Sequence, residues 1–516
     1  MPAPPAEEPG GTLAPAAPLA KLYIREYRIT GVKKLSPLEA GEAVYPFLGP
    51  ERTAADVEQA RSALEAAYHE KGFQTVIVEV PEQTGRGGII VLKAVEQEVG
   101  RLRVRGARYF DLERIKRAVP SVSPGSVPNF NALTQENLAL NKWPDRRVTP
   151  SLRPGVEPGT VDIDLTVEDK LPLHGSVELN NRYSADTTPL RLSASANYGN
   201  LWQLGHAVGF TYLTAPERRD DSEIFSAYYL LRLPKVDGLT LIFQGTKQTS
   251  NITSNNIGSV TVAAPGQTLG VRANISLPAG KNFYQSVSLG LDYKHYEESV
   301  LLGGVLTASP LTYWPLSATY DGTWAGKGYT TSVNLAGVAG LRGAGSSPAE
   351  FELKRHASGG NFAYVHGELS DERDVGKVAQ TYARVQGQLA SQALVNTEQV
   401  AGGGSSTVRG YLESEVLGDN GIFATVELRT PSLLGWVKPK GNEWRFYAFA
   451  DGGYVSVRDS LPGQEKHYRL ASAGVGSSLR LLDHLNGSID LAMPLISQSE
   501  TKRGDGRVNF RVWADF

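Results

Sequence analysis

Apolar and polar residues alternate along most of this chain, from about residue 172 to the last residue. The final segment shows the pattern best, because every second residue is apolar: Val508, Phe510, Val512, Ala514 and Phe516. A period of two is that of a β-strand with one apolar and one polar face. About sixteen such segments follow one another with no convincing helix between them, which predicts an antiparallel transmembrane β-barrel with a polar lumen. The predicted fold class is therefore mainly β.

The composition excludes several other classes of protein. A net charge of −2 and evenly spread Lys and Arg residues give no reason to expect a nucleic-acid partner. The chain has no cysteine, which excludes thiol catalysis, thiolate metal sites and disulfides. The 8 histidines show no metal-ligand spacing, and no G-x-S-x-G motif is present. We therefore expect no metal, no cofactor and no catalytic residue. No apolar run of about eighteen residues suggests a transmembrane helix.

The first 171 residues have a different organisation. Residues 1–21 are rich in Pro, Ala and Gly, do not resemble a signal peptide, and predict a flexible segment. Residues 22–96 predict the order β-α-α-β-β, and residues 97–171 repeat it. The longer helix of the first unit is expected over 53–72, with Thr53 and Asp56 at its cap. This order resembles that of the POTRA domain, a small periplasmic module found in front of outer-membrane barrels.

The predicted connections between barrel strands alternate between short and long. Bacterial barrels have short turns on the periplasmic side and long loops outside, so both ends of the barrel segment should lie in the periplasm. This predicts a location in the outer membrane of a Gram-negative bacterium, with the two leading domains in the periplasm. The longest connection, 390–420, lies between the eleventh and twelfth predicted strands. A loop of this length in a compact fold is typically functional.

This loop and one later strand carry the candidate site. Three glycines, 402–404, allow a sharp turn and are followed by the gating candidates Val408, Arg409, Gly410 and Tyr411. On the strand expected over 443–455, the alternation places Phe449, Asp451 and Gly453 on the face that points into the lumen. A loop arginine and a lumen aspartate are natural partners if the loop folds inward. Removing one member of such a sequestered pair costs about 3–5 kcal/mol, whereas a hydrated pair contributes about 0–1 kcal/mol.

The two motifs resemble the paired signatures of the superfamily of POTRA-bearing outer-membrane barrels. Two POTRA-like units before sixteen strands are similar to its two-partner secretion branch, the TpsB transporters of the haemolysin and filamentous-haemagglutinin type (ShlB/FhaC/HecB-like). The resemblance implies that the loop returns into the lumen and that Arg409 pairs with Asp451. It also implies that the terminal Phe516 is the signal read during barrel assembly. Some members begin with a helix that plugs the pore. Residues 1–20 of this chain are rich in proline and therefore form a helix poorly.

The resemblance implies a transporter that is not an enzyme. It would bind an unfolded partner exoprotein through its POTRA domains and export it through the barrel without ATP. The other expected partners are outer-membrane lipids and the barrel-assembly machinery, with the protein itself a monomer.

Three alternatives stay open at this point. The protein could be an insertase-type relative that acts on outer-membrane proteins, a passive porin, or an outer-membrane enzyme such as a phospholipase. Arg409 and Asp451 could also pin the loop in a purely structural role.

Overall fold

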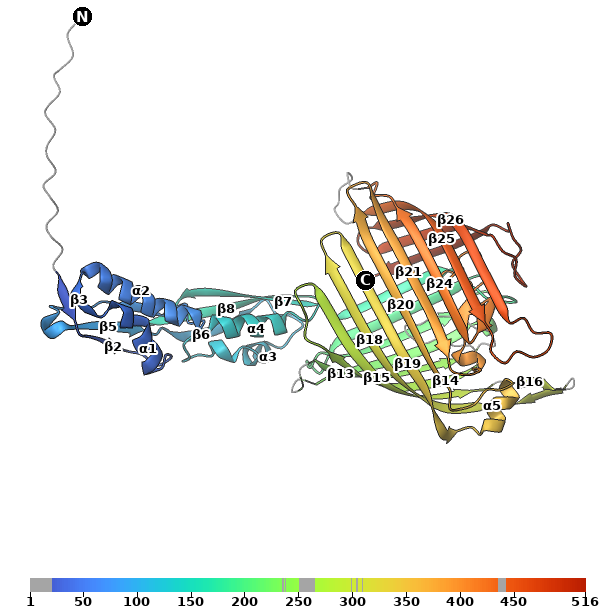
Figure 1. Cartoon of the computed structure of the whole chain (residues 1–516), viewed down its shortest axis with the longest axis horizontal. Coiled ribbons are helices and arrows are strands. Elements are labelled where there is room, and N and C mark those ends of the chain that lie inside the picture. The colour runs from blue at the N-terminus through green and yellow to red at the C-terminus, as the bar shows by residue number, and fades with distance from the viewer. Residues whose placement is uncertain are drawn as a thin grey trace, which may run out of the picture. The chain divides into compact units, whose positions relative to one another are not determined.

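The computed structural model describes residues 21–233, 236, 238–249, 265–297, 299–302, 305–308, 310–434 and 442–516 (Figure 1). The chain divides into two compact units, Met1–Leu171 and Pro172–Phe516. The segment expected to be flexible, 1–21, lies outside the described residues except for Lys21. Among the described residues, no helix is long and apolar enough to cross a membrane.

The first module of the N-terminal unit packs two helices against a three-stranded sheet of order β2-β5-β4. Strand β2 is parallel to β5, while β1 and β3 form a separate pair that the sequence did not predict. The core includes Leu64 and Tyr68 of α2 and Leu92 of β5, all fully buried. The elements are β1 (Leu22–Ile24), β2 (Glu26–Thr30), α1 (Pro37–Val44), η1 (Tyr45–Phe47), β3 (Gly49–Arg52), α2 (Ala54–Glu70), β4 (Ile77–Glu79), η2 (Arg86–Gly88) and β5 (Ile89–Val95).

Side-chain caps determine where these helices begin. Thr53 is the N-cap of α2, and the Asp56 carboxylate accepts the Thr53 backbone N–H at 2.8 Å in a capping box. The helix expected over 53–72 is confirmed, and Gly72, with a φ of 92°, follows its end. Strand β4, which follows this helix, is only 3 residues long.

The second module has the order β-α-α-β-β, which is that of the first module without its additional pair β1-β3. Its sheet has the order β6-β8-β7, with β6 parallel to β8, and its core includes the buried Ile115, Ile163 and Leu165. Strands β2 and β6 therefore each form an edge of their sheet. The elements are β6 (Glu98–Arg105), α3 (Leu112–Arg117), η3 (Pro120–Val122), α4 (Phe130–Leu140), β7 (Arg146–Pro154) and β8 (Thr160–Asp169).

The end of α2 and the start of α4 are joined by hydrogen bonds between the two modules. The backbone N–H of Phe130 donates to the carbonyl of Gly72 at 2.8 Å, and Asn129 Nδ2 donates to the carbonyl of Lys71 at 2.9 Å. Val127 is buried in the core of the first module. The junction is therefore an ordered contact between two helix ends, not a loose linker.

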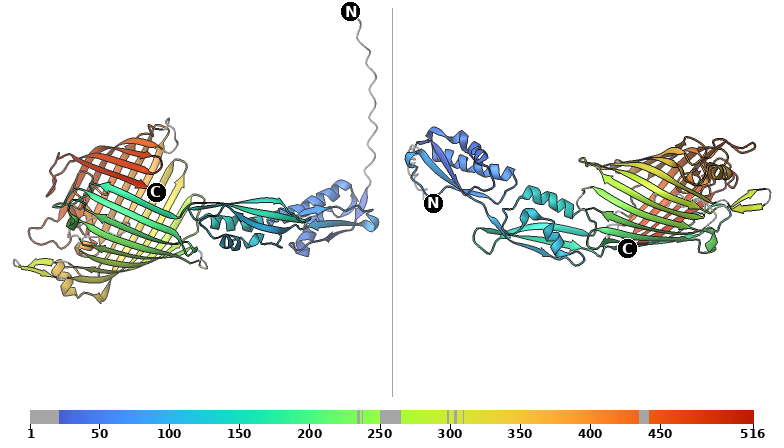
Figure 2. Two further views of the ribbon diagram at one scale, coloured as in Figure 1. Left: turned by 180° about the vertical axis from the view of Figure 1, so that it is seen from behind. Right: turned by 90° about the horizontal axis from the view of Figure 1, so that it is seen from below.

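The second unit is a closed barrel of sixteen antiparallel strands, as the sequence predicted (Figures 1 and 2). Every strand pairs with its neighbours along the chain, and β28 closes the barrel on β9, with Arg511–Asp515 opposite Ser176–Asn180. The strands are β9 (Leu173–Asn180), β10 (Arg191–Leu201), β11 (His206–Thr214), β12 (Glu223–Arg232), β13 (Leu239–Gln248), β14 (Gly266–Ser276), β15 (Phe283–Tyr296), β18 (Leu311–Gly326), β19 (Tyr329–Gly345), β20 (Ala363–Val375), β21 (Ala379–Ala390), β24 (Asn420–Arg429), β25 (Glu443–Ser456), β26 (His467–Leu481), β27 (Leu485–Pro494) and β28 (Arg507–Asp515).

Within the described residues, the expectation of a barrel segment without helices is wrong at one α-helix. Helix α5 (Pro348–Lys354) lies in the loop after β19, and Ser347 and Glu350 form its capping box. At only 7 residues, the helix is too short to interrupt the alternating pattern that dominates the sequence. The loop between β15 and β18 contains a hairpin of β16 (Ser299–Leu302) and β17 (Val305–Ala308). Strands β18 and β19, with 16 and 17 residues, are longer than the roughly ten residues typical of a barrel strand.

The two faces of the barrel differ as the alternation predicted. Outward side chains such as Val475, Ile489 and Leu491 are about half exposed, as expected for a surface that faces lipid. Polar side chains face inward and pair there. Nη1 and Nη2 of Arg272 on β14, for example, donate to the two carboxylate oxygens of Asp292 on β15, each at 2.7 Å. The lumen is therefore lined by groups that compensate one another's charge.

Candidate functional site

The loop between β21 and β24, residues 391–419, returns along the barrel wall. It contains η5 (Asn396–Glu398) and a small hairpin of β22 (Val400–Gly402) and β23 (Val416–Gly418). Gly403 and Gly404 turn the chain with φ values of 103° and 92°, a conformation that favours glycine. Beyond this turn, the carbonyl of Ser406 accepts hydrogen bonds from Arg384 and Gln386 of β21. These bonds attach the loop to β21.

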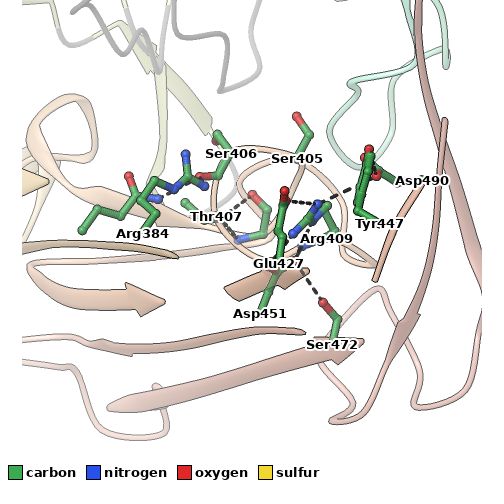
Figure 3. A network of polar contacts seen from close by, with 12 residues as sticks. Arg384, Ser405, Ser406, Thr407, Arg409, Glu427, Tyr447, Asp451, Ser472 and Asp490 are labelled. Carbon is green, nitrogen blue, oxygen red and sulfur yellow. Dashed lines mark hydrogen bonds and ion pairs between the residues drawn. The ribbon is translucent and has the colours of Figure 1, made fainter. Parts of the chain in front are cut away.

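Arg409 stands at the tip of this loop and is buried (Figure 3). Its Nε and Nη2 donate to the two carboxylate oxygens of Asp451 on β25, each at 2.8 Å. The backbone N–H of Arg409 also donates to Asp451, at 3.1 Å. Its Nη1 donates to Glu427 of β24 at 2.8 Å. The structure thus brings together the loop arginine and the lumen aspartate, and adds a second carboxylate that the sequence analysis missed.

The guanidinium of Arg409 stacks on Phe449, which shares the inward face of β25 with Asp451. The Cζ atom lies 3.5 Å from the centroid of the Phe449 ring. Such cation–π contacts are strongest where water is excluded. Glycine on the neighbouring strand leaves room for the ring, because a Cβ on Gly474 would lie 2.5 Å from Phe449 Cζ. The Phe449 ring therefore packs against one face of the Arg409 guanidinium.

Further charges surround the pair. Asp490 of β27 lies 3.8 Å from Arg409 Nη1 and accepts a hydrogen bond from Tyr447 at 2.7 Å. Glu427 is shared with Arg429, whose Nε donates to it at 2.8 Å. Burial disfavours the charge on Arg409, but the hydrogen bonds and charge of Asp451, with Glu427 and Asp490, raise the pKa of the guanidinium above its usual value. Arg409 is therefore a permanent cation within a ring of carboxylates.

The neighbours of Arg409 hold the tip by packing. Val408 and Tyr411 are fully buried in a cluster with Phe423 and Val455 of the wall. The Tyr411 hydroxyl also donates to the carbonyls of Ala471 and Ile496.

Two glycines of the site stand where a side chain would not fit. Gly410 has a φ of 96°, which favours glycine, and a Cβ there would lie 3.2 Å from the backbone nitrogen of Pro494. A Cβ on Gly453 would lie 2.6 Å from the ring of Phe423. The residues of the two sequence motifs thus form one continuous contact.

Phe516, the expected assembly signal, lies apart from this site. Its side chain is 68% exposed. Its backbone N–H donates to the carbonyl of Gly175 at 3.0 Å, and its own carbonyl accepts from Gly175 at 2.8 Å. The last residue therefore continues the pairing of β28 with β9 at the barrel closure. Its role in assembly stays a prediction.

The sequence analysis missed two further buried carboxylates in the loop, Glu398 and Asp419. Glu398 pairs with Lys294 of β15, and Asp419 pairs with Arg355, which follows α5. Parity could have placed Lys294 inside the barrel, but no sequence signal joins it to a residue 104 positions away. Within the described residues, no group of three or more His, Asp or Glu side chains is placed to hold a metal ion.

Comparison with known proteins identifies the family. Residues 159–479 match the haemolysin secretion/activation protein family ShlB/FhaC/HecB, and residues 22–97 match the ShlB-type POTRA domain. The chain belongs to this family. The expected TpsB-type fold, two-partner secretion and outer-membrane location are thereby confirmed, and the protein is a transporter and not an enzyme.

Individual relatives are distant in sequence. The chain is 23% identical over 417 residues to the outer membrane transporter CdiB of Dickeya dadantii (strain 3937). The aligned region covers 75% of this chain and 68% of that protein. It is 20% identical over 463 residues to the heme/hemopexin transporter protein HuxB of Haemophilus influenzae (strain ATCC 51907 / DSM 11121 / KW20 / Rd), covering 87% and 79%.

Solved structures share the fold. CdiB from Escherichia coli superposes with a TM-score of 0.62 at 21% identity, covering 99% of this chain and 92% of that one. BamA from Haemophilus ducreyi, lacking POTRA domains 1–3, superposes with a TM-score of 0.59 at 14% identity, covering 96% and 100%. At these identities the likeness concerns the fold alone.

Proposed function

We propose that this transporter binds an unfolded partner exoprotein in the periplasm and exports it through the barrel lumen, with the loop 391–419 as its gate. The observation that carries the proposal is the buried ion pair between Arg409 at the loop tip and Asp451 on the inner wall. A chain in transit needs the space that this tip occupies. The loop must therefore change position, and the Arg409 contacts define its closed position.

Residues 22–96 and 97–171 are proposed as two POTRA domains that capture the partner, with 1–21 as a flexible lead-in. The support is that β2 and β6 each form the edge of a sheet within these segments. An extended segment can add to such an edge through backbone hydrogen bonds that tolerate varied sequence. This suits an exoprotein that is still unfolded.

The direction of transport would come from the partner itself. The periplasm contains no ATP, so the free energy must come from binding on one side and folding on the other. Opening the gate breaks the sequestered contacts at the tip but also hydrates both charges, so its cost is smaller than the destabilisation of about 3–5 kcal/mol that follows removal of one partner from a buried pair. Partner binding would have to offset this smaller cost.

The test of the gate is Arg409→Ala, followed by secretion of the co-encoded exoprotein. Arg373→Ala is a matched control, because Arg373 makes an exposed ion pair with Asp371 near the end of β20. We expect Arg409→Ala to impair secretion at normal barrel levels and to increase the resting single-channel conductance. Unchanged secretion and conductance would reject the gating role and leave the pair as a structural contact.

Two earlier alternatives are tested with the same protein. Deleting 22–95 should abolish export if the POTRA region captures the partner, whereas a passive porin would keep its conductance and need no such region. If the protein were an insertase, the same deletion would instead change the level of other outer-membrane proteins. The match to secretion/activation proteins favours export.

Phe516 is proposed to be read by the barrel-assembly machinery. The exposed ring and the backbone pairing with Gly175 support this role. Phe516→Ala should then lower the amount of folded barrel in the membrane without changing the conductance of the barrels that do assemble. The lipid-facing surface and a monomeric state are part of the same proposal.

A further inference from the structure

The loop 391–419 is fixed at three separate places, only one of which is its tip. We define the tip as residues 403–414 and the stems as residues 391–402 and 415–419. The tip carries Arg409, and each stem carries one buried carboxylate, Glu398 or Asp419. A buried carboxylate is stable only if it is paired and hydrogen-bonded, so the partners of these two residues show what each stem is attached to.

The first stem is attached to the wall on β15, β18 and β20. Glu398 is 4% exposed and accepts hydrogen bonds from Lys294 at 2.5 Å, from the Tyr313 hydroxyl at 2.6 Å and from the Tyr364 hydroxyl at 2.8 Å. The Tyr313 hydroxyl also contacts Thr397. All three donors come from barrel strands, so this stem is part of the wall.

The second stem is attached to two other loops. Asp419 is completely buried and accepts hydrogen bonds from Arg355 Nη2 and the backbone N–H of Arg458, both at 2.7 Å. It also accepts the backbone N–H of Leu394 at 2.8 Å, which joins the two stems. Arg355 in turn donates to the carbonyls of Leu394 and Arg458. Moving this stem would break contacts of the segments 346–362 and 457–466 as well.

The tip, by contrast, is bounded by backbone turns. Gly403 and Gly404 have φ values of 103° and 92°, and Ser414 at the other boundary has a φ of 55°. Residues held in this region of φ are sites where a small change in backbone angles redirects the chain. The polar and apolar contacts of Arg409 and Tyr411 are made with β24–β27 and the segment after β27. The tip also contacts the stems, because the Leu412 N–H donates to Glu415 at 2.9 Å and the cluster that holds Val408 and Tyr411 includes Val400 and Val416. These contacts involve neither Glu398 nor Asp419, so the tip can leave this part of the wall without breaking the two buried carboxylate sites.

We propose that only the tip moves during transport, and that Glu398 and Asp419 are positioning residues that keep both stems docked. This rests on the proposed gating function of the loop. Release of the whole loop would break the tip contacts and, in addition, both buried carboxylate sites. Movement of the tip alone breaks only the first of these. The stems thus hold a fixed frame from which Arg409 returns to Asp451.

Cross-links in this cysteine-free chain separate the two movements. Ser358 and Ala393 are neighbours in a β-bridge, and Ser358→Cys/Ala393→Cys would fasten the first stem to the segment after α5. Strand neighbours lie about 4.8 Å apart, within the Cα separation of about 4.4–6.8 Å that a disulfide spans. Gln386→Cys/Ser406→Cys with a short bis-maleimide would fasten the tip to β21, because Gln386 Nε2 lies 2.7 Å from the Ser406 carbonyl. Reduction and N-ethylmaleimide, respectively, give the uncross-linked controls of each variant.

The readouts are secretion of the co-encoded exoprotein and single-channel conductance of the full-length protein, which needs no partner. We expect the tip cross-link to abolish secretion and full-conductance openings, and the stem cross-link to leave both unchanged. Loss of both when the stem is cross-linked would overturn the tip-only movement and leave the gating role intact. Normal secretion with the tip cross-linked would reject the gating role itself.

A second measurement covers the case in which a cysteine variant does not fold. In Arg409→Ala, hydrogen–deuterium exchange should rise in residues 403–414 and stay at the wild-type level in 391–402 and 415–419. Asp419→Asn combined with Arg409→Ala should extend the increase to both stems, whereas Glu352→Gln, in an exposed pair with His356, should not. Increased exchange of the stems in Arg409→Ala alone would overturn the proposal.

Discussion

Arg409 and Asp451 are joined by two parallel hydrogen bonds, from Nε and Nη2 to the two carboxylate oxygens, each 2.8 Å long. The backbone N–H of Arg409 donates to the same carboxylate, so one strand residue holds both the side chain and the main chain of the loop tip. The planar guanidinium also lies over the Phe449 ring. This arrangement depends on a flat, forked cation and not on positive charge alone.

The first prediction concerns that fork. Arg409→Lys keeps the charge but cannot donate to Asp451 through two parallel bonds while also reaching Glu427. Hydrogen bonds to charged groups contribute about 1.5–3 kcal/mol each, so we expect the closed position to be destabilised by at least about that amount. The fraction of time spent open in planar bilayers should rise clearly above that of Arg373→Lys, the control in an exposed pair. Equal open fractions would mean that charge alone holds the tip.

A second prediction concerns the space under Phe449. A Cβ on Gly474 would lie 2.2 Å from the Leu491 carbonyl oxygen and 2.5 Å from the Phe449 ring, so Gly474→Ala should strain the pairing of β26 with β27 and displace the ring from Arg409. Overpacking of this kind costs about 1–3 kcal/mol. We expect a lower temperature of barrel unfolding, measured by gel mobility after heating, together with more frequent channel openings. Gly452→Ala is the matched control, because no atom lies within 4 Å of the Cβ it would add; the same shift in both variants would exclude a specific effect through Phe449.

Parity was sufficient to place Phe449 and Asp451 inside the barrel, because a strand alternates strictly and each strand has only two faces. It could not identify Glu427 as a partner of Arg409, since that requires the register between β24 and β25. A shift of the register by two residues keeps every side chain on the same face, so the alternation alone does not fix which residues of β24 and β25 are opposite each other. The pairing of Arg409 with Asp451 was itself implied by family resemblance and not by the alternation.

The missed contacts share one physical property: they join residues far apart in the chain. Lys294 and Glu398 are 104 residues apart, and Arg355 and Asp419 are 64 apart. Each partner looks like an ordinary polar residue in its own segment. Only closure of the barrel brings these charges into a buried space, where pairing becomes necessary.

A third prediction concerns the junction between α2 and α4. Asn129 Oδ1 accepts the Ala132 N–H at 3.0 Å as the N-cap of α4, while Nδ2 donates to the Lys71 carbonyl. Asn129→Ala removes both contacts and should cost about 0.5–2 kcal/mol through the lost cap alone. Asn129→Asp keeps a capping oxygen but loses the donor to Lys71. Gln135→Ala, at an exposed position of α4, is the control.

The two Asn129 variants should differ in which structure they disturb. Amide exchange in the first turn of α4 should increase in Asn129→Ala and stay near the wild-type rate in Asn129→Asp. The distance between spin labels on α2 and α4 should broaden in both variants. An unchanged distance distribution in Asn129→Asp would show that the Lys71 contact does not fix the junction.

The last prediction is a pH dependence at the start of α1. Hydrogen bonding to Lys71, followed by bonds from the Ser36 backbone and hydroxyl, lowers the pKa of Glu39 from 4.5 to about 2. Because the folded pKa is the lower one, this stabilisation is complete above pH 4.5 and is lost as the pH falls towards 2. Amide exchange of α1 in the full-length protein should therefore be faster in Glu39→Gln than in wild type at pH 7, and the two should converge as the pH approaches 2. Glu42→Gln, an exposed substitution in the same helix, should follow wild type throughout; a constant difference between Glu39→Gln and wild type across this range would show that the carboxylate charge is not what holds the cap.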